Sequence, residues 1–434
     1  MSATTVQLAR QPELRLWQHG AVFLLAIAVI VSRRPDAVFH AQFYAEDGHA
    51  WYADAYNLGW WPALFRTWTG YFLTLPRLAA AFALLAPLYR VPLLLNLIAI
   101  SIQALPANLL LSSRSSAWGS LRFRAALAGM YLVLPNCDEV SYGITDANFL
   151  LAMCALVLLL ASTPQSTAWR LFDIAIVLLC GLSGPFCIFL LPVAVFLAFK
   201  RRDSWRWVPV GILAGCCLIQ AWALLFLAPA ARSNRALGAS LQLFGRILGS
   251  QVYLGALLGS NALSAMPGRW LSIVLCCVAI GGTAFAIVCS FKSPLVMRLF
   301  LLFSAVLFVG ALKAPVEWGR PELPVWDVLS ASPGYRHWFF PTLAFAWSLL
   351  YGFRSRIVGV KIVSAALLCL MSLGILRDWR HHTFQETNLA DSVKNFAAAP
   401  PGAVVTIQEQ PEGWTMKLIK HGSTKQGPTK QGRN

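Results

Sequence analysis

Two adjacent carboxylates, Glu46 and Asp47, stand in the stretch 43–49 of a strongly hydrophobic chain. They follow a first apolar run, residues 17–32, close to the start of a polar segment. A carboxylate held in a partly dry site, within reach of a hydroxyl group, can remove the hydroxyl proton as a general base. We predict Asp47 as this base, with Glu46 as the second candidate for the same catalytic role. If Asp47 is the base, Glu46 could hold either the hydroxyl-bearing molecule or a structural arginine. The simpler alternative is that both acids belong to a solvated loop.

A second polar group, Tyr335, Arg336 and His337, opens a late apolar segment. A guanidinium group carries a fork of N–H donors that matches phosphate oxygens, and a cation stabilises the charge that develops on a departing phosphate. A site at the start of a span lies at the depth of lipid headgroups. We therefore predict that Arg336 and His337 bind a phosphate. The alternatives are snorkelling of Arg336 at a span end and packing of His337 as an interfacial histidine.

Three further acids, Asp138, Glu139 and Asp146, lie in the polar stretch 136–148 between two apolar runs. Three acids at a membrane boundary are unusual, and they predict a second substrate-binding patch made mainly of Asp138 and Asp146. Two alternatives stay open. The acids could form a metal site, although a metal usually needs more than carboxylates at this spacing, or they could lie at a helix N-terminus, which favours negative charge.

Three arginines, Arg232, Arg235 and Arg246, lie in the later polar segment 228–269. They would meet either anionic lipid headgroups or the phosphate of a substrate. Nine of the ten cysteines lie inside apolar runs without the spacing of metal ligands and are typical of small buried residues; the tenth, Cys137, lies at a span end. We predict no metal centre and no cofactor, and whether a divalent cation is needed stays open.

The rest of the chain must position these residues in a membrane. Of 434 residues, 58% are hydrophobic and only 12% are charged, with a mean hydropathy of +0.62. Since about 20 apolar residues cross a bilayer as a helix, the apolar runs predict an all-α polytopic membrane protein with about ten to twelve transmembrane helices. The net charge of +17 comes from Lys and Arg in short loops between apolar runs. This pattern is typical of membrane-flanking cations and argues against a nucleic-acid partner.

We predict that the chain consists of a transmembrane domain at 1–376, a small C-terminal domain at 377–421 and a disordered basic tail at 422–434. Within the first, the loop at 33–70 is rich in Trp and Tyr, which favour the membrane interface, and it predicts interfacial helices, one of them over 60–68. In the C-terminal domain, strands are predicted over 402–407 and 414–419. A bend or tight hairpin is predicted at 181–185, an amphipathic helix around 241–258, and the crossings of 72–124 stay open.

Taken together, these features resemble the GT-C superfamily of membrane glycosyltransferases. The resemblance covers the architecture of most of the chain and two short motifs, Tyr44-Ala45-Glu46-Asp47-Gly48 and Tyr335-Arg336-His337-Trp338-Phe339-Phe340-Pro341. It implies transfer of a sugar from a polyprenyl-phosphate donor to a glycan or glycolipid of the cell envelope, with inversion at the anomeric carbon. It also implies a multi-pass protein of the bacterial inner membrane, in contact with membrane lipids, whose active site faces the periplasm.

Other functions fit parts of the sequence. A transporter or flippase of lipid-linked sugars often shows internal repeats with broken helices, but the two halves of this chain do not resemble each other, and its ionisable residues lie mostly at span ends. A polymerase or ligase of envelope polysaccharide would depend on arginines of late loops, here Arg232, Arg235 or Arg320. A non-enzymatic membrane scaffold also stays open. A nucleotide-sugar donor is disfavoured because no soluble nucleotide-binding motif is present.

Overall fold

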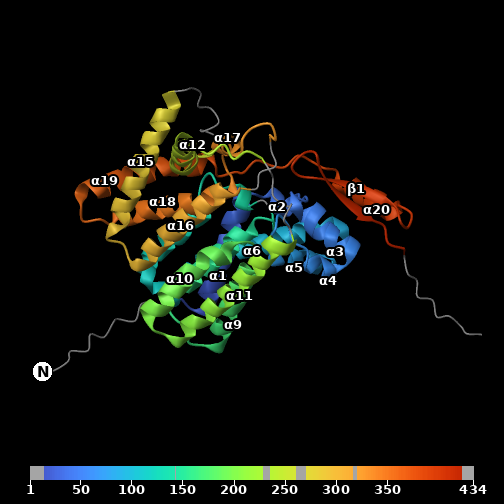
Figure 1. The fold of residues 1–434 in the computed structure, drawn as a ribbon, viewed down its shortest axis with the longest axis horizontal. Coiled ribbons are helices and arrows are strands. Elements are labelled where there is room, and N and C mark those ends of the chain that lie inside the picture. Colours follow the sequence, from blue (N-terminus) through green and yellow to red (C-terminus); the bar gives the residue numbers. More distant parts are fainter. Residues whose placement is uncertain (1–13, 142, 228–234, 261–269, 316–319, 423–434) are drawn as a thin grey trace, which may run out of the picture.

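The computed structural model describes residues 14–141, 143–227, 235–260, 270–315 and 320–422, and this part of the chain is mostly helical (Figure 1). Six segments are long and apolar enough to cross a membrane: 16–33, 88–111, 204–227, 272–291, 295–313 and 358–377. The corresponding helices are α1 (Leu16–Arg33), α6 (Val91–Leu111), α11 (Trp207–Trp222), α15 (Trp270–Phe291), α16 (Leu295–Lys313) and α19 (Val358–Arg377). The protein is therefore membrane-embedded and helical, as predicted.

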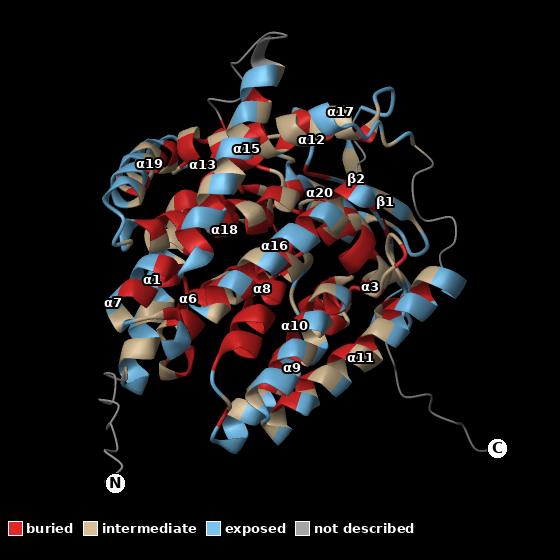
Figure 2. Ribbon diagram, turned by 60° about the vertical axis from the view of Figure 1, so that its left-hand side comes forward, coloured by how far each residue is buried: buried red, intermediate tan, exposed pale blue. Residues whose placement is uncertain are grey.

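Five further helices of the bundle are shorter than these segments: α7 (Leu121–Leu132), α8 (Ala147–Leu160), α9 (Thr167–Gly181), α10 (Phe186–Arg201) and α18 (Phe339–Phe353). The helix α8 has almost no polar side chain, and twelve of its fourteen residues are buried. It lies in the middle of the bundle against α6, α9 and α10, where Figure 2 shows it in the colour of buried residues. Because almost all of its residues are buried against other helices, α8 forms the centre on which they pack.

The connections at one end of the bundle contain arginines that form ion pairs and hydrogen bonds with neighbouring helices. Arg114, just after α6, pairs with Asp173 of α9 through two contacts of 2.9 and 2.6 Å between guanidinium nitrogens and carboxylate oxygens. Arg201 and Arg206, on either side of the α10–α11 turn, donate to the backbone carbonyls of residues 159–161. These bonds satisfy carbonyl groups at the C-terminus of α8 that have no partner within the helix.

The first loop packs at the opposite end as a series of short helices. They are α2 (Asp36–Phe39), the π-helical turn η1 (Asp47–Tyr52), α3 (Ala53–Leu58), α4 (Trp60–Leu64) and α5 (Thr74–Ala83). The helix predicted over 60–68 forms, but it ends at Leu64. Asp54 bonds both Arg66 and Arg77, at 2.6 and 2.7 Å, and joins α3 to α5. Trp60 and Trp61 are exposed, as expected for residues at a membrane interface.

Two other predicted features are confirmed near this end. The turn at 181–185 separates α9 from α10, and Gly184, at φ +95°, donates its N–H to the carbonyl of Phe72 at 2.9 Å. The segment 241–258 is helical throughout, as α12 (Leu241–Ile247), η7 (Leu248–Leu254) and α13 (Gly255–Leu258). The remaining short elements are η2 (Leu88–Arg90), η3 (Ser113–Trp118), η4 (Glu139–Ser141), η5 (Ser204–Arg206), η6 (Ala223–Leu227), α17 (Val325–Ser330) and η8 (Arg336–Trp338).

The C-terminal domain consists of α20 (Leu389–Ala398) and an antiparallel pair, β1 (Val404–Glu409) and β2 (Trp414–Ile419). The second strand has the predicted bounds, and the first begins two residues later than predicted because the chain turns at 400–402. Ile407 and Met416 face each other across the ladder and are fully buried. The pair lies against η1 and α3 of the first loop (Figure 1). Residues 423–434, predicted to be disordered, lie outside the described residues.

Candidate active site

Asp47 is held by the loop that leads into α8. Its carboxylate accepts hydrogen bonds from the backbone N–H groups of Ile144 and Thr145, at 3.3 and 3.0 Å, and from the Thr145 hydroxyl at 2.6 Å. Trp51 Nε1 donates to the same hydroxyl oxygen at 2.9 Å. A Cβ atom at Gly143 would lie 2.2 Å from the Asp47 carboxylate, so the loop can approach this closely only with a glycine there.

The burial of Asp47 changes its acidity. Only 2% of the residue is exposed. Burial raises the pKa of Asp47 to about 7, against the hydrogen bonds from Thr145 and Ile144, which favour the charged form. All three of these donors are already committed to the carboxylate. Asp47 is therefore a buried residue that fixes the loop at 143–145, rather than a side chain that opens to solvent.

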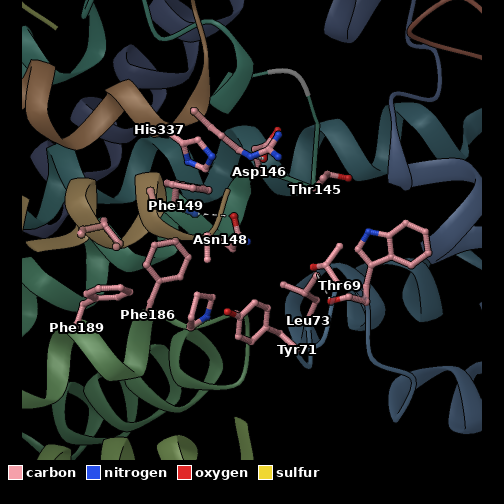
Figure 3. A pocket seen from close by; sticks show the side chains of 18 of the residues that line it. Thr69, Tyr71, Leu73, Thr145, Asp146, Asn148, Phe149, Phe186, Phe189 and His337 are labelled. Carbon is pink, nitrogen blue, oxygen red and sulfur yellow. Dashed lines mark hydrogen bonds and ion pairs between the residues drawn. The ribbon is translucent and has the colours of Figure 1, made fainter. Parts of the chain in front are cut away.

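Thr145, which holds Asp47, lines a cavity of about 240 Å³ together with Asp146 and His337 (Figure 3). Glu46, and not Asp47, forms part of its wall. Five parts of the fold meet around the cavity: the first loop, the start of α8, the α9–α10 turn, the end of α16 and the start of η8. Polar residues occupy one part of the lining: Glu46, Thr69, Tyr71, Thr145, Asp146, Asn148, Arg336 and His337. Aromatic and aliphatic side chains form the rest, among them Phe149, Phe186, Phe189 and Leu307. The cavity thus combines a charged part with an apolar wall.

Arg336 is the cation of this cavity, and two acids hold it. Its Nη1 atom lies 2.5 Å from a Glu139 carboxylate oxygen, its backbone N–H donates to the other oxygen at 2.6 Å, and its Nε lies 3.7 Å from Asp146. Burial acts to lower the pKa of Arg336, but the nearby charges of Glu139, Tyr335 and Asp146 together outweigh burial and raise this pKa well above its usual value. Burial raises the pKa of Asp146 well above its usual range although Arg336 acts against this.

His337 lines the cavity with both ring nitrogens buried and without a hydrogen-bond partner among the described residues. Burial, followed by the charge of Arg336, lowers the pKa of His337 to about 3. The ring is therefore neutral at physiological pH and offers one donor and one acceptor. It can bind a phosphate or a sugar hydroxyl through a hydrogen bond, but not as the cation that the sequence suggested.

Four of the predicted site residues, Glu46, Asp146, Arg336 and His337, thus meet in one cavity. The sequence matches no model of a known protein family and no curated protein. The chemistry of this cavity is therefore the basis for assigning a function.

The other predicted residues lie elsewhere. Tyr335 packs with its ring centre 4.9 Å from that of His337 and is outside the cavity lining. Asp138 pairs with His381, after α19, at 3.1 Å. Arg235 donates to the backbone carbonyls of residues 320 and 323, the latter at 2.6 Å, which connects two loops. Arg232 lies outside the described residues.

Several residues of the site were not predicted. Glu139, noted only as one of three acids, holds Arg336, and Thr145 holds Asp47. Both belong to the polar stretch 136–148, and this stretch was the feature of the sequence from which they could have been identified. A further pair joins the C-terminal domain to the first loop: His49 Nδ1 lies 2.7 Å from a Glu409 carboxylate oxygen. No pattern in the sequence connects these two residues.

Within the described residues, no group of three or more His, Cys, Asp or Glu side chains is placed to hold a metal ion.

Proposed function

We propose that the protein is a GT-C-type glycosyltransferase, which moves a sugar from a polyprenyl-phosphate donor to a glycan or lipid acceptor of the cell envelope. The supporting observation is the single cavity lined by the carboxylate of Glu46, the guanidinium of Arg336 and an aromatic wall. A lipid-linked sugar has a hydroxyl-rich ring, an anionic phosphate and an apolar chain. The three parts of the cavity are complementary to these three parts of the donor.

In this mechanism Glu46 is the general base. The acceptor oxygen attacks the anomeric carbon as the bond from that carbon to the phosphate oxygen breaks, and the phosphate leaves with the electron pair. Glu46 takes the proton of the acceptor hydroxyl, and a single displacement inverts the anomeric centre. Glu46 is preferred over Asp47 because only Glu46 lines the cavity. Asp47 then acts as a positioning residue that holds the loop at 143–145, including Thr145, in the cavity wall.

Arg336 and His337 are the groups that bind the departing phosphate. Arg336 keeps its charge between Glu139 and Asp146, and a fixed cation stabilises negative charge that develops in a site with little water. His337 adds a hydrogen bond, since neither of its ring nitrogens is bonded within the described part of the chain. The aromatic residues Phe149, Phe186 and Phe189 would contact the first part of the lipid chain.

The orientation in the membrane follows from the charges at the two ends. If the five shorter helices of the bundle cross as well as the six long ones, the described part makes eleven crossings, within the predicted range. The runs at 200–202 and 354–356 are basic and lie at the end opposite the cavity. By the positive-inside rule this basic end is cytoplasmic. The cavity then faces the periplasm of a bacterial inner membrane.

The test is sugar transfer by the purified protein in liposomes. A panel of radiolabelled polyprenyl-phosphate sugars serves as donor and envelope extract as acceptor. Since general base catalysis contributes about 10²–10⁴-fold, Glu46→Gln should lower the transfer rate by at least about 100-fold. Asp47→Asn is the neighbouring control, and it should retain more activity because it alters the position of the loop and not the base.

The outcomes separate the candidate functions. If Asp47→Asn abolishes transfer and Glu46→Gln does not, the two acids have the opposite roles. If no donor is consumed but labelled lipid crosses the bilayer, the protein is a transporter or flippase. If transfer occurs and depends on Arg232, Arg235 or Arg320 instead of Glu46, a polymerase or ligase of envelope polysaccharide is the better description.

A further inference from the structure

A second and larger cavity, of about 610 Å³, lies at the basic end of the bundle. It is formed where α15 ends and α16 begins, and where α18 ends and α19 begins, with the end of η3 as a further wall. Its charged residues are Lys292, Arg354 and Arg356. The active-site cavity lies at the other end of α16, near Leu307 and Gly310, so a helix rise of 1.5 Å per residue places the two cavities roughly 20–30 Å apart.

The lining of this basic cavity contains three cations and no acid. Lys292, Arg354 and Arg356 are exposed, and none has a carboxylate within ion-pair distance in the described part of the chain. This differs from Arg114 and Arg336, which acids hold. Arg354 is positioned by the ring of Phe123, whose centre lies 4.4 Å from its guanidinium carbon. Three uncompensated cations around one cavity attract an anion.

The remaining walls are apolar and continue onto the outer surface of the bundle. Ile287, Val288 and Phe291 line the cavity and are exposed on the C-terminal turns of α15, as is Ile357 before α19. The Tyr351 hydroxyl donates to the carbonyl of Trp118 at 2.7 Å and closes the inner side. An anion bound here would therefore have an apolar surface directly beside it, at the position where the chains of a lipid run along the helices.

We infer that this basic cavity binds the phosphate headgroup of an anionic phospholipid in the membrane leaflet opposite the active site. Lys292, Arg354 and Arg356 would bind the phosphate, and the exposed residues of α15 would contact an acyl chain. Snorkelling cations alone would sit singly at helix ends, whereas these three surround a common space with hydroxyl groups of Ser293 and Ser355. The inference is independent of the proposed glycosyltransferase activity.

The experiment is native mass spectrometry of the detergent-purified protein with added phosphatidylglycerol, and with phosphatidylcholine as the zwitterionic comparison of zero net charge. One variant combines Lys292→Gln, Arg354→Gln and Arg356→Gln. Its control removes the same charge at the same end, outside the cavity, by combining Arg122→Gln, Lys200→Gln and Arg202→Gln. The cavity variant should bind phosphatidylglycerol about tenfold more weakly than wild type or worse, and the control should change by less than about twofold.

Further control variants and ligands test which molecule binds and whether the variants remain folded. Arg354→Lys with Arg356→Lys keeps the charge and should retain binding. If both charge-removing variants lose phosphatidylglycerol equally, only the general charge of the surface matters and the site is refuted. If phosphatidylcholine binds as tightly as phosphatidylglycerol, the cations do not select the headgroup. If inorganic phosphate raises the unfolding temperature as much as the lipid does, the cavity takes free phosphate and the lipid assignment is wrong.

Discussion

Replacing Asp47 with Asn should remove a pH-dependent loss of stability from the protein. Burial raises the pKa of Asp47 from 3.8 to about 7. Between these two pH values the folded state binds more protons than the unfolded state, so the free energy of unfolding falls as the pH rises. One pKa unit corresponds to about 1.4 kcal/mol, and the full effect of Asp47 is therefore about 4 kcal/mol.

The assay is thermal unfolding of the wild type and of Asp47→Asn in one detergent over a series of pH values. The Asn variant has its own constant cost, because its amide group would face the backbone N–H of Ile144, which now donates to the carboxylate. The test is therefore the change in the difference between the two proteins and not the difference at one pH. From about pH 5 to about pH 8, the wild type should lose about 3 kcal/mol relative to the variant.

Glu46→Gln is the matched control, since it changes the adjacent carboxylate in the same way. That variant should follow the pH dependence of the wild type, because it still contains Asp47. If Asp47→Asn and the wild type keep a constant difference across this range, Asp47 does not titrate there and the reasoning from burial is refuted. If Glu46→Gln removes the pH dependence instead, the assignment of the buried acid is wrong.

Three further predictions concern stability elsewhere. Arg114→Gln leaves the buried carboxylate of Asp173 without its partner and should cost about 3–5 kcal/mol, whereas a double variant with apolar residues at both positions should cost less in thermal unfolding. Burial acts to lower the pKa of His49, but the hydrogen bond and charge of Glu409, together with Glu46 and the backbone of Ala45, outweigh burial and raise this pKa above its ordinary value. The stabilisation that comes from protonating His49 is thus present below about pH 6.5 and is lost as the pH rises through the raised pKa. Proteolysis of the C-terminal domain should accelerate with pH in the wild type and lose this dependence in Glu409→Gln. Gly48→Ala should accelerate this proteolysis at every pH, because the new Cβ would lie 2.0 Å from a Glu409 oxygen. A cleavage rate equal to that of the wild type would refute this close contact.

Most secondary structure could be predicted because it depends on local patterns. The amphipathic segment 241–258 is helical, the turn at 181–185 lies between two helices, and the strand over 414–419 has the predicted bounds. Each of these depends on residues that are neighbours in the chain. The number of membrane crossings could not be predicted in this way. A helix such as α8, with 14 residues, is apolar enough to cross a membrane but shorter than a membrane-spanning helix usually is.

The partners of the charged residues could not be predicted, because they come from distant parts of the chain. Arg336 is 197 positions from Glu139, and His49 is 360 positions from Glu409. The sequence offered either a lipid headgroup or a substrate phosphate for Arg235, whereas its contacts are backbone carbonyls at 320 and 323. A charged residue at a span end is compatible with several partners, and only the packing of the helices selects one.

The adjacent acids Glu46 and Asp47 show that sequence patterns cannot assign contacts even to neighbouring residues. The pattern at 43–49 identifies a membrane-boundary carboxylate, but it cannot decide between Glu46 and Asp47. Ala45 has φ +46°, and the π-helical turn η1 begins at Asp47, so the two side chains leave the backbone in different directions. One reaches the cavity wall and the other reaches the loop of Thr145. Since successive residues of a helix point about 100° apart, neighbours in the sequence can hold separate roles, here the proposed base in the cavity wall and a buried residue that holds the loop of Thr145.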